Sequence, residues 1–477
     1  MVTGPIAWKI GLNEAQLRVG SWPVLRGLLL VLGTVGSICL GRFYGLIALS
    51  LVWTPYVFFN PREGLWISPS FILLASLVSP PEGFVTGVGY SPELAYWAIG
   101  IGVLFTAMLI PYLQAWVRAQ DESHLRAWNL RKLMPPRGFR AFAGISVVAA
   151  AVGVAHGYSL QNVAKQFFGC ALLCGYFLFV LRFAPRQEDM EQIINRIVYV
   201  AVMCSVIYTA MYFSLFSEQN FSKHLTSIVV YDGGLFVLLV PRILRDRARI
   251  RIDRTLIVAL FLFAIPVLAQ LKRVVGACLI CGLLALGLRS ISRRRRYLYA
   301  AASFLLLALA LTTGLLNPIG TWFSKYADSD YLIPEDVQSN FSVVTRVAEF
   351  SQVMESLHGT PILGEGLGST ITWYDPFARV YWDQETTDNG LLYLLVKMGI
   401  VGTIAFLWFI YPLGATALRN RLTGIHLALF LLFIFHLLQM LADVTFFYFL
   451  TAGWVGTTCG FLYILNKNSE IAAATPA

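Results

Sequence analysis

The chain has 477 residues, of which 57% are hydrophobic and only 13% are charged. A soluble domain carries about 25% charged residues, so this composition excludes an ordinary soluble protein. The net charge of +10 does not indicate nucleic-acid binding, because the basic residues lie in short segments between apolar runs and form no basic domain.

Apolar runs approaching 20 residues predict helices that cross a membrane, since a helix satisfies all its backbone groups internally. In chain order we expect spans at 23–41, 43–60, 64–79, 93–116, 139–156, 163–183, 194–216, 226–241, 255–271, 274–289, 297–316, 386–411, 423–440 and 444–465. The third span is short and contains Pro69, so a re-entrant segment is the alternative there. The sequence therefore predicts an all-α polytopic membrane protein with about 12–14 transmembrane helices.

The domain organisation follows from these spans. We divide the chain into an amphipathic cytoplasmic or interfacial segment (1–22), a bundle of about 11 spans (23–316), a loop domain (317–385), three C-terminal spans (386–465) and a cytoplasmic tail (466–477). A frayed N-terminal tail is the alternative for the first segment. The N-terminus lacks the cleavage pattern of a signal peptide.

The basic residues indicate the orientation. With the N-terminus inside, about 25 Lys and Arg residues fall on the cytoplasmic side and about eight outside, as the positive-inside rule requires. Both termini are therefore expected in the cytoplasm, and the long loop is expected on the outer side of the membrane.

The long loop combines helical, glycine-rich and aromatic segments. A helical stretch is expected at 343–357, and the glycine-rich segment 363–369 precedes five aromatic residues: Trp373, Tyr374, Phe377, Tyr381 and Trp382. No strand–turn–helix unit surrounds the glycines, so they are interpreted as turn glycines rather than as a phosphate-binding loop. A loop of this length is more often functional than a plain connector.

Basic residues on the outer side are candidate anion ligands. Lys272 and Arg273 occupy a tight turn between two apolar helices, and an arginine there offers planar donors suited to phosphate or pyrophosphate. Snorkelling to lipid headgroups is the alternative. Arg346 shares a helix face with Glu349, for which the alternative is a local ion pair of little energetic value. Lys223 is external as well.

Asp388 and Asn389 stand where the chain re-enters the membrane. Asp388 is either a functional carboxylate or a cap of the helix that follows. Lys397 lies about two turns deeper, and a charged residue inside the membrane is a candidate functional residue. The sequence names no partner for it.

Cysteine and histidine residues do not indicate a metal site. All seven cysteines lie in apolar runs, and the Cys278–Cys281 pair is interpreted as buried thiols in mid-helix. The histidines have no metal-ligand spacing: His124, His156, His224, His358, His426 and His436. We expect no metal and no cofactor.

Three segments in this order resemble the O-antigen ligase and Wzy-type polysaccharide polymerase superfamily. The turn 269–276 resembles the family's arginine-bearing turn. The segments 345–350 and 361–368 resemble its loop pattern of an arginine followed by a glycine-rich exit. The segment 388–402 resembles its "H-N-x-x-L-x-x-L-x-x-x-G-x-x-G" helix start.

The resemblance implies a metal-independent glycosyltransferase of a bacterial inner membrane, whose active site and long loop face the periplasm and whose donor is a glycan on undecaprenyl pyrophosphate. Arg273 and Arg346 would bind the pyrophosphate and stabilise the charge of the leaving group, and Asp388 would be the base. The resemblance adds further substrate-binding candidates: Lys223, Lys272, Glu349 and Asn389. The implied partners are the lipid-linked glycan, an acceptor glycan, the bilayer and a chain-length regulator protein, with no nucleic acid.

One departure separates two activities within this superfamily. Ligases carry a histidine where this chain has Asp388, which favours a polymerase of O-antigen or exopolysaccharide over a ligase that transfers glycan to lipid A core. A flippase or other transporter of lipid-linked oligosaccharide is the alternative of another class, and a structural or assembly subunit is a third. Transporters often have internal repeats and charges at the membrane midplane, whereas the candidate charges here lie at the outer mouth.

Overall fold

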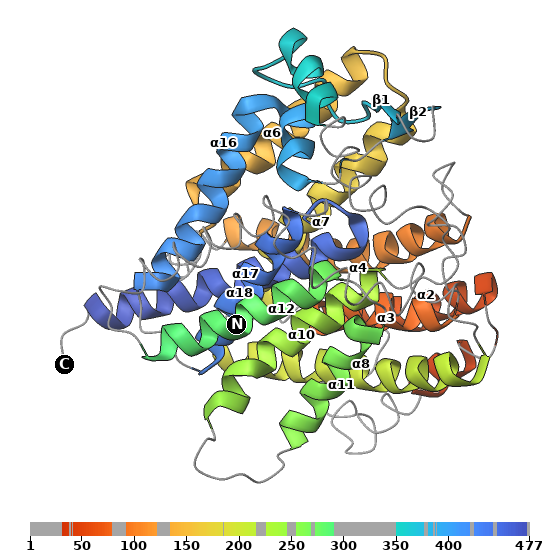
Figure 1. Cartoon of the computed structure of the whole chain (residues 1–477), viewed down its shortest axis with the longest axis vertical. Coiled ribbons are helices and arrows are strands. Elements are labelled where there is room, and N and C mark those ends of the chain that lie inside the picture. The colour runs from red at the N-terminus through yellow and green to blue at the C-terminus, as the bar shows by residue number, and fades with distance from the viewer. Residues whose placement is uncertain are drawn as a thin grey trace, which may run out of the picture.

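A computed structural model of the chain describes residues 31–37, 40, 42–78, 92–121, 134–184, 186–215, 226–245, 254–268, 272–290, 350–375, 380–384, 387, 389–419, 424–441 and 446–474 (Figure 1). Its labelled helices are α2 (Arg42–Phe59), α3 (Gly64–Val78), α4 (Pro92–Asp121), α6 (Arg137–Ala155), α7 (Leu160–Phe183), α8 (Gln187–Leu215), α10 (Thr226–Arg245), α11 (Arg254–Leu268), α12 (Lys272–Ser290), α16 (Gly390–Arg419), α17 (Gly424–Met440) and α18 (Phe449–Ala474).

Each of these helices overlaps one span predicted from the sequence. Within the described residues, five helices are long and apolar enough to cross a membrane, and four shorter helices are apolar as well. The protein is therefore an all-α polytopic membrane protein. The predicted span at 297–316 lies outside the described residues, whereas 31–37, within the first predicted span, is helical. Pro69 lies inside an unbroken α3.

The predicted loop contains one helix and one hairpin among its described residues. The loop helix covers 350–359, inside and just beyond the predicted helical stretch. Strands β1 (Ile371–Asp375) and β2 (Val380–Gln384) pair antiparallel, with Trp373 opposite Trp382 and Tyr374 opposite Tyr381. The sequence analysis predicted no strands here. Aromatic residues favour strands, and cross-strand aromatic pairs stabilise a hairpin.

Helices that are distant in sequence form the centre of the bundle. α16 runs beside α6, and α18 runs beside α7 (Figure 1). Phe139 of α6, Phe177 of α7 and Phe409 of α16 pack together, with ring centroids 4.5–5.3 Å apart. Such aromatic pairs add about 0.5–1.5 kcal/mol each beyond the area that they bury.

Glycine allows α7 and α18 to approach closely. A Cβ atom added to Gly456 of α18 would lie 2.3 Å from the carbonyl oxygen of Leu173 in α7. Small residues permit such backbone contact between membrane helices, where tight packing replaces the hydrophobic driving force. A side chain at this position would push the two helices apart.

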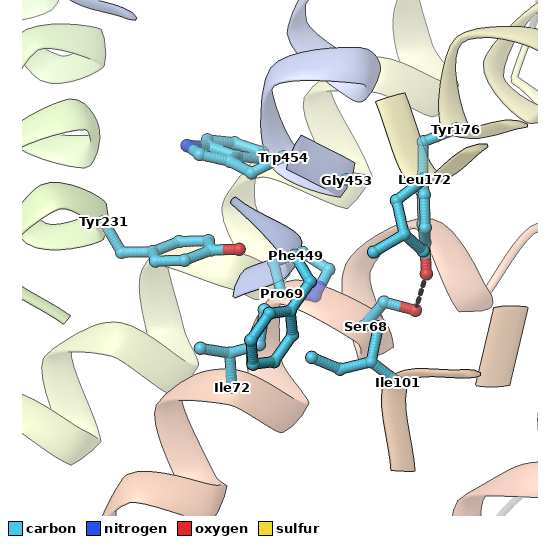
Figure 2. A pocket seen from close by; sticks show the side chains of 10 residues that line it. All are labelled: Ser68, Pro69, Ile72, Ile101, Leu172, Tyr176, Tyr231, Phe449, Gly453 and Trp454. Atoms are coloured by element: carbon cyan, nitrogen blue, oxygen red, sulfur yellow. Dashed lines mark hydrogen bonds between the residues drawn. The ribbon is translucent and has the colours of Figure 1, made fainter. Parts of the chain in front are cut away.

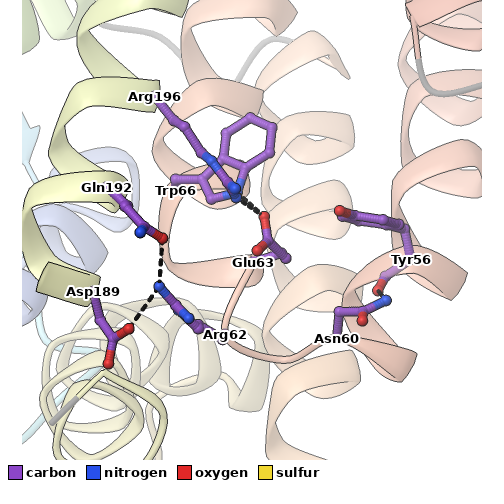
Figure 3. A network of polar contacts seen from close by, with 8 residues as sticks. All are labelled: Tyr56, Asn60, Arg62, Glu63, Trp66, Asp189, Gln192 and Arg196. Carbon is purple, nitrogen blue, oxygen red and sulfur yellow. Dashed lines mark hydrogen bonds and ion pairs between the residues drawn. The ribbon is translucent and has the colours of Figure 1, made fainter. Parts of the chain in front are cut away.

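Polar contacts at one end of the bundle join segments expected on the cytoplasmic side. Arg62, between α2 and α3, forms a 2.7 Å ion pair with Asp189 in the first turn of α8 (Figure 3). The neighbouring Glu63 accepts a hydrogen bond from Arg196 of α8 (Figure 3). We call this the Arg62 end of the bundle.

Polar contacts at the other end join segments expected on the periplasmic side. His156, just after α6, contacts the carbonyl oxygen of Glu365 at 2.7 Å. Asn389, just before α16, donates to the carbonyl oxygen of Leu441, just after α17, at 3.1 Å. These contacts agree with the predicted alternation of the helices. We call this the Asn389 end; that it faces the periplasm stays a prediction.

Candidate functional site

The site residues predicted from the sequence differ in how the structure describes them. Four lie outside the described residues: Lys223, Arg346, Glu349 and Asp388. Lys272 and Arg273 are the first two residues of α12, in the predicted turn after α11, and their backbone is described. Asn389 is described with its side chain. The described neighbours therefore show where the three predicted segments lie.

Asn389 is the N-cap of α16. Its Oδ1 atom accepts hydrogen bonds from the backbone N–H groups of Leu391, at 2.8 Å, and Leu392, at 3.3 Å. These groups have no partner within their own helix, and an Asn side chain is well suited to satisfy them. The Nδ2 atom donates to Leu441. The capping role considered for Asp388 is thus filled by Asn389, whose own predicted role in substrate binding stays a prediction.

The start of α12 lies against α10 and α17. A Cβ atom added to Gly233 of α10 would lie 2.6 Å from Val274, which follows Arg273, and 3.2 Å from Phe435 of α17. Phe435 precedes Leu441 by about 9 Å of helical rise. The α12 segment and the Asn389 segment therefore both approach the C-terminal end of α17.

The loop helix packs on the N-terminal half of α16. Val353 of the loop helix, Ile371 of β1 and Val396 of α16 form a small buried cluster, with Leu357 and Leu392 packed against it. Arg346 precedes this helix in the sequence. The described residues next to each of the three predicted segments thus adjoin α16 or α17 at the Asn389 end of the bundle.

The glycine-rich segment 361–369, called the glycine turn below, lies against α6. Gly364, Gly366 and Gly368 have φ values of 71°, 93° and 96°, which side chains disfavour. A Cβ atom on Gly366 would also lie 2.4 Å from the backbone nitrogen of Gly153 in α6. The interpretation as turn glycines is confirmed.

The glycine turn completes a break in α16. Gly399 has φ 63° and ψ −165°, so the helix is interrupted there. The N–H of Ile400, which would normally donate to Val396, donates to Pro361 at 3.0 Å instead. The carbonyl of Val396 accepts from Glu365 at 2.7 Å. Backbone from the loop thus satisfies helix groups that lipid could not satisfy.

Lys397 has a partner that the sequence did not reveal. Its side chain is fully buried in α16, and its Nζ atom donates to the carbonyl and hydroxyl oxygens of Ser369, which ends the glycine turn. Gln166 of α7 contacts the same turn. These three residues lie far apart in sequence, so no local pattern relates them.

Tyr158, between α6 and α7, lies at the same end. Burial raises the pKa of its phenol above the ordinary value, and the nearby Glu365 carboxylate raises the pKa further. The phenol therefore stays protonated at neutral pH.

A small cavity lies within the bundle among α3, α4, α7, α10 and α18 (Figure 2). Its volume is about 10 Å³, room for about one water molecule. Tyr176 donates to Ser68 at its wall (Figure 2). Tyr231 donates to the carbonyl of Leu450 at 2.8 Å. This cavity is too small for a sugar or a prenyl chain, so it is not the substrate site.

Buried thiols and imidazoles occupy the positions expected of core groups. The six described cysteines are free, and five of them are buried. His426 and His436 are buried as well. Among the described residues, no three His, Cys, Asp or Glu side chains gather as a metal site requires.

Comparison with known proteins adds one finding. A family model described as O-antigen ligase matches residues 256–407. This match supports the resemblance to the O-antigen ligase and Wzy-type superfamily. It spans α11, α12 and most of α16, together with the loop between them, and it includes Arg273, Arg346 and Asp388. No curated protein matches the chain.

Proposed function

We propose, from the O-antigen ligase family match of residues 256–407, that this protein is a periplasmic-face glycosyltransferase that polymerises glycan repeat units carried on undecaprenyl pyrophosphate. One observation supports this most. The described neighbours of Arg273, Arg346 and Asp388 adjoin α16 and α17 at one end of the bundle, although they span more than a hundred residues of sequence.

The proposed chemistry is electrostatic and needs no metal. Arg273 and Arg346 donate to the pyrophosphate oxygens of the donor. The acceptor hydroxyl attacks the anomeric carbon and forms the new glycosidic bond, while the bond from that carbon to the pyrophosphate oxygen breaks. The arginines stabilise the negative charge left on the pyrophosphate. Asp388 takes the proton of the acceptor hydroxyl.

The position of Asn389 supports a chemical role for Asp388. Because Asn389 already caps α16, the helix does not require the carboxylate of Asp388 as a cap.

Ligation to lipid A core is the second candidate, because the matching family is described as O-antigen ligase. In both cases the donor is a lipid-linked glycan in a bilayer. Deleting the protein from its bacterium and analysing the lipid-linked product separates the two. Accumulated single repeat units would support a polymerase, whereas finished chains left on the carrier would support a ligase. Unchanged periplasmic intermediates with normal surface glycan would contradict both.

The same deletion also tests the transporter alternative. A lost flippase leaves its lipid-linked oligosaccharide on the cytoplasmic face, whereas a lost transferase leaves it on the periplasmic face. Protection of the accumulated glycan from a glycosidase added to spheroplasts would therefore contradict the proposed function.

A further inference from the structure

Hydrogen bonds to three helices, α6, α7 and α16, hold the glycine turn in place. Leu367 donates its N–H to the carbonyl of Ala149 in α6 at 2.9 Å. Gln166 of α7 accepts from the N–H of Gly368 at 2.7 Å and donates to the carbonyl of Ser369 at 3.2 Å. At the break in α16, the backbone groups of Ile400 and Val396 form hydrogen bonds with the backbone of the turn. The last two residues of the turn therefore sit within a set of directed polar contacts.

Lys397 links α16 to Ser369, the last residue of the glycine turn. Its Nζ atom donates to the Ser369 carbonyl and, at 2.9 Å, to the Ser369 hydroxyl. That hydroxyl donates onward to the carbonyl of Gly366 at 3.0 Å. Both Lys397 and Ser369 have no solvent exposure. Burying an amine is costly unless polar partners replace its water. The lysine therefore needs the oxygen atoms of Ser369, and the turn is in turn held by the lysine.

The aromatic ring of Tyr393 lies beside the same amine. The Nζ atom of Lys397 is 5.7 Å from the ring centroid. Tyr393 is one turn closer to Asn389 on α16, and the ring face attracts a cationic group. The ring of Tyr393 therefore helps to hold the amine on the part of α16 that is nearer to the Asn389 end.

The turn held by Lys397 connects both loop elements. The loop helix ends immediately before the turn, and β1 begins two residues after Ser369, with Ile371 buried against Val353 and Val396. Arg346 precedes the loop helix, and Asp388 follows β2 in sequence. A displacement of the turn would therefore move both elements that flank the proposed site.

We propose that Lys397 is a positioning residue for glycosyl transfer: through Ser369 it holds the glycine turn, and with it the loop helix and β1, in the position against α16 that the transfer requires. This inference rests on the proposed function. Lys397 does not contact the substrate in this role. It acts through the turn, so its loss should affect geometry at the site more than the amount of folded protein.

The test compares Lys397→Met with Asn466→Leu in the purified full-length protein in nanodiscs. Methionine keeps an unbranched chain that is one heavy atom shorter and removes the donor. Asn466 is a matched control, because it is a buried polar residue that also binds α16, through the Leu413 carbonyl at 2.9 Å, but at the Arg62 end. Hydrogen exchange of residues 360–372 is measured together with kcat and KM for a lipid-linked glycan donor.

For Lys397→Met we expect exchange of residues 360–372 to rise about tenfold or more. We also expect kcat per folded enzyme to fall about 10²-fold, as small misplacements of reacting groups do. Asn466→Leu should lower Tm but leave both quantities near wild type. Unchanged exchange in Lys397→Met, or raised exchange with unchanged kcat, would overturn the proposal, as would equal effects in Asn466→Leu.

Ser369→Ala keeps the inference testable if Lys397→Met does not fold. It removes the hydroxyl and leaves the carbonyl, so we expect a smaller rise in exchange over the same residues and a smaller fall in kcat. Unchanged exchange or unchanged kcat in this variant would contradict the inference. Absence of transferase activity in the wild-type protein would contradict the proposed function itself, whatever the exchange shows.

Discussion

The side-chain amide of Asn389 joins two helices: it caps α16 through Oδ1 and donates through Nδ2 to the carbonyl of Leu441, 3.1 Å away at the end of α17. One residue thus satisfies the free N–H groups of one helix and a carbonyl beyond the end of another. The contact ties the start of α16 to the end of α17.

Asn389→Ala is expected to lower the free energy of unfolding by about 2 kcal/mol, roughly 1 from the cap and 1 from the lost hydrogen bond to Leu441. Asn389→Asp keeps the capping oxygen and loses the donor, so about half of that loss is expected. Denaturant titration in detergent checks both values. An aspartate variant as unstable as the alanine variant would contradict the capping role.

Arg273→Ala and Arg346→Ala should each abolish long-chain glycan, with kcat lower by about 10²–10³-fold, because each removes a donor to the leaving pyrophosphate. The lysine variants should recover part of the activity, since they keep the charge but not the planar donor pair. Arg242→Ala is the control: this arginine contacts Asn195 at 3.3 Å near the Arg62 end. Glycan length on gels and protein level in the membrane fraction are measured together, and normal glycan in both site variants would exclude the transferase mechanism.

Asp388→Asn tests the base. The variant keeps the shape of the side chain and removes its ability to take a proton, so we expect nearly complete loss of transfer per folded enzyme. Because Asn389 caps α16, such a loss is not a capping effect. In the wild type, activity should fall at acidic pH as the carboxylate becomes protonated. Full activity in the variant would remove Asp388 from the mechanism.

Gly399→Ala should release the glycine turn from α16. The backbone conformation of Gly399 is strained for any other residue by about 1–3 kcal/mol, and the added Cβ would lie 2.3 Å from the carbonyl oxygen of Ile362. Gly424→Ala is the control, because Gly424 has a similar φ of 55° but open space around it. A clearly larger fall in Tm for Gly399→Ala is expected. Equal falls would mean that the close approach contributes nothing.

Glu63→Gln should have a small effect. The Glu63–Arg196 pair is partly exposed, with 18% and 44% of the side-chain surfaces accessible, and such pairs contribute about 0–1 kcal/mol. We expect Tm to change by little, less at high salt, with normal glycan length. A loss of glycan in this variant would indicate that the Arg62 end takes part in the function.

The helices could be predicted because apolar runs and charged boundaries are local signals. The predicted span 64–79 and the observed α3 (Gly64–Val78) nearly coincide. The start of α8, at Gln187, lies earlier than the predicted 194, because hydrogen bonding continues a helix through polar residues outside the apolar run. The hairpin was missed because its aromatic residues gave no strand signal beyond composition.

The interior of the candidate site could not be predicted in the same way. Lys397 stood out in the sequence as a charge within a span, but its partner Ser369 is set by tertiary folding. Gly399 falls on a glycine of the family pattern in segment 388–402, but the pattern does not indicate its positive φ of 63°. Asn389 was interpreted through the family resemblance, whereas its hydrogen bonds follow from the helix terminus.

The break at Gly399 has a consequence for biosynthesis. α16 cannot enter lipid with its own backbone complete, since Ile400 and Val396 need partners from residues 361–365. Those partners precede α16 in the chain and are synthesised before it, as is α6, which also binds them. The order of the chain therefore makes every partner of the break available by the time α16 is synthesised.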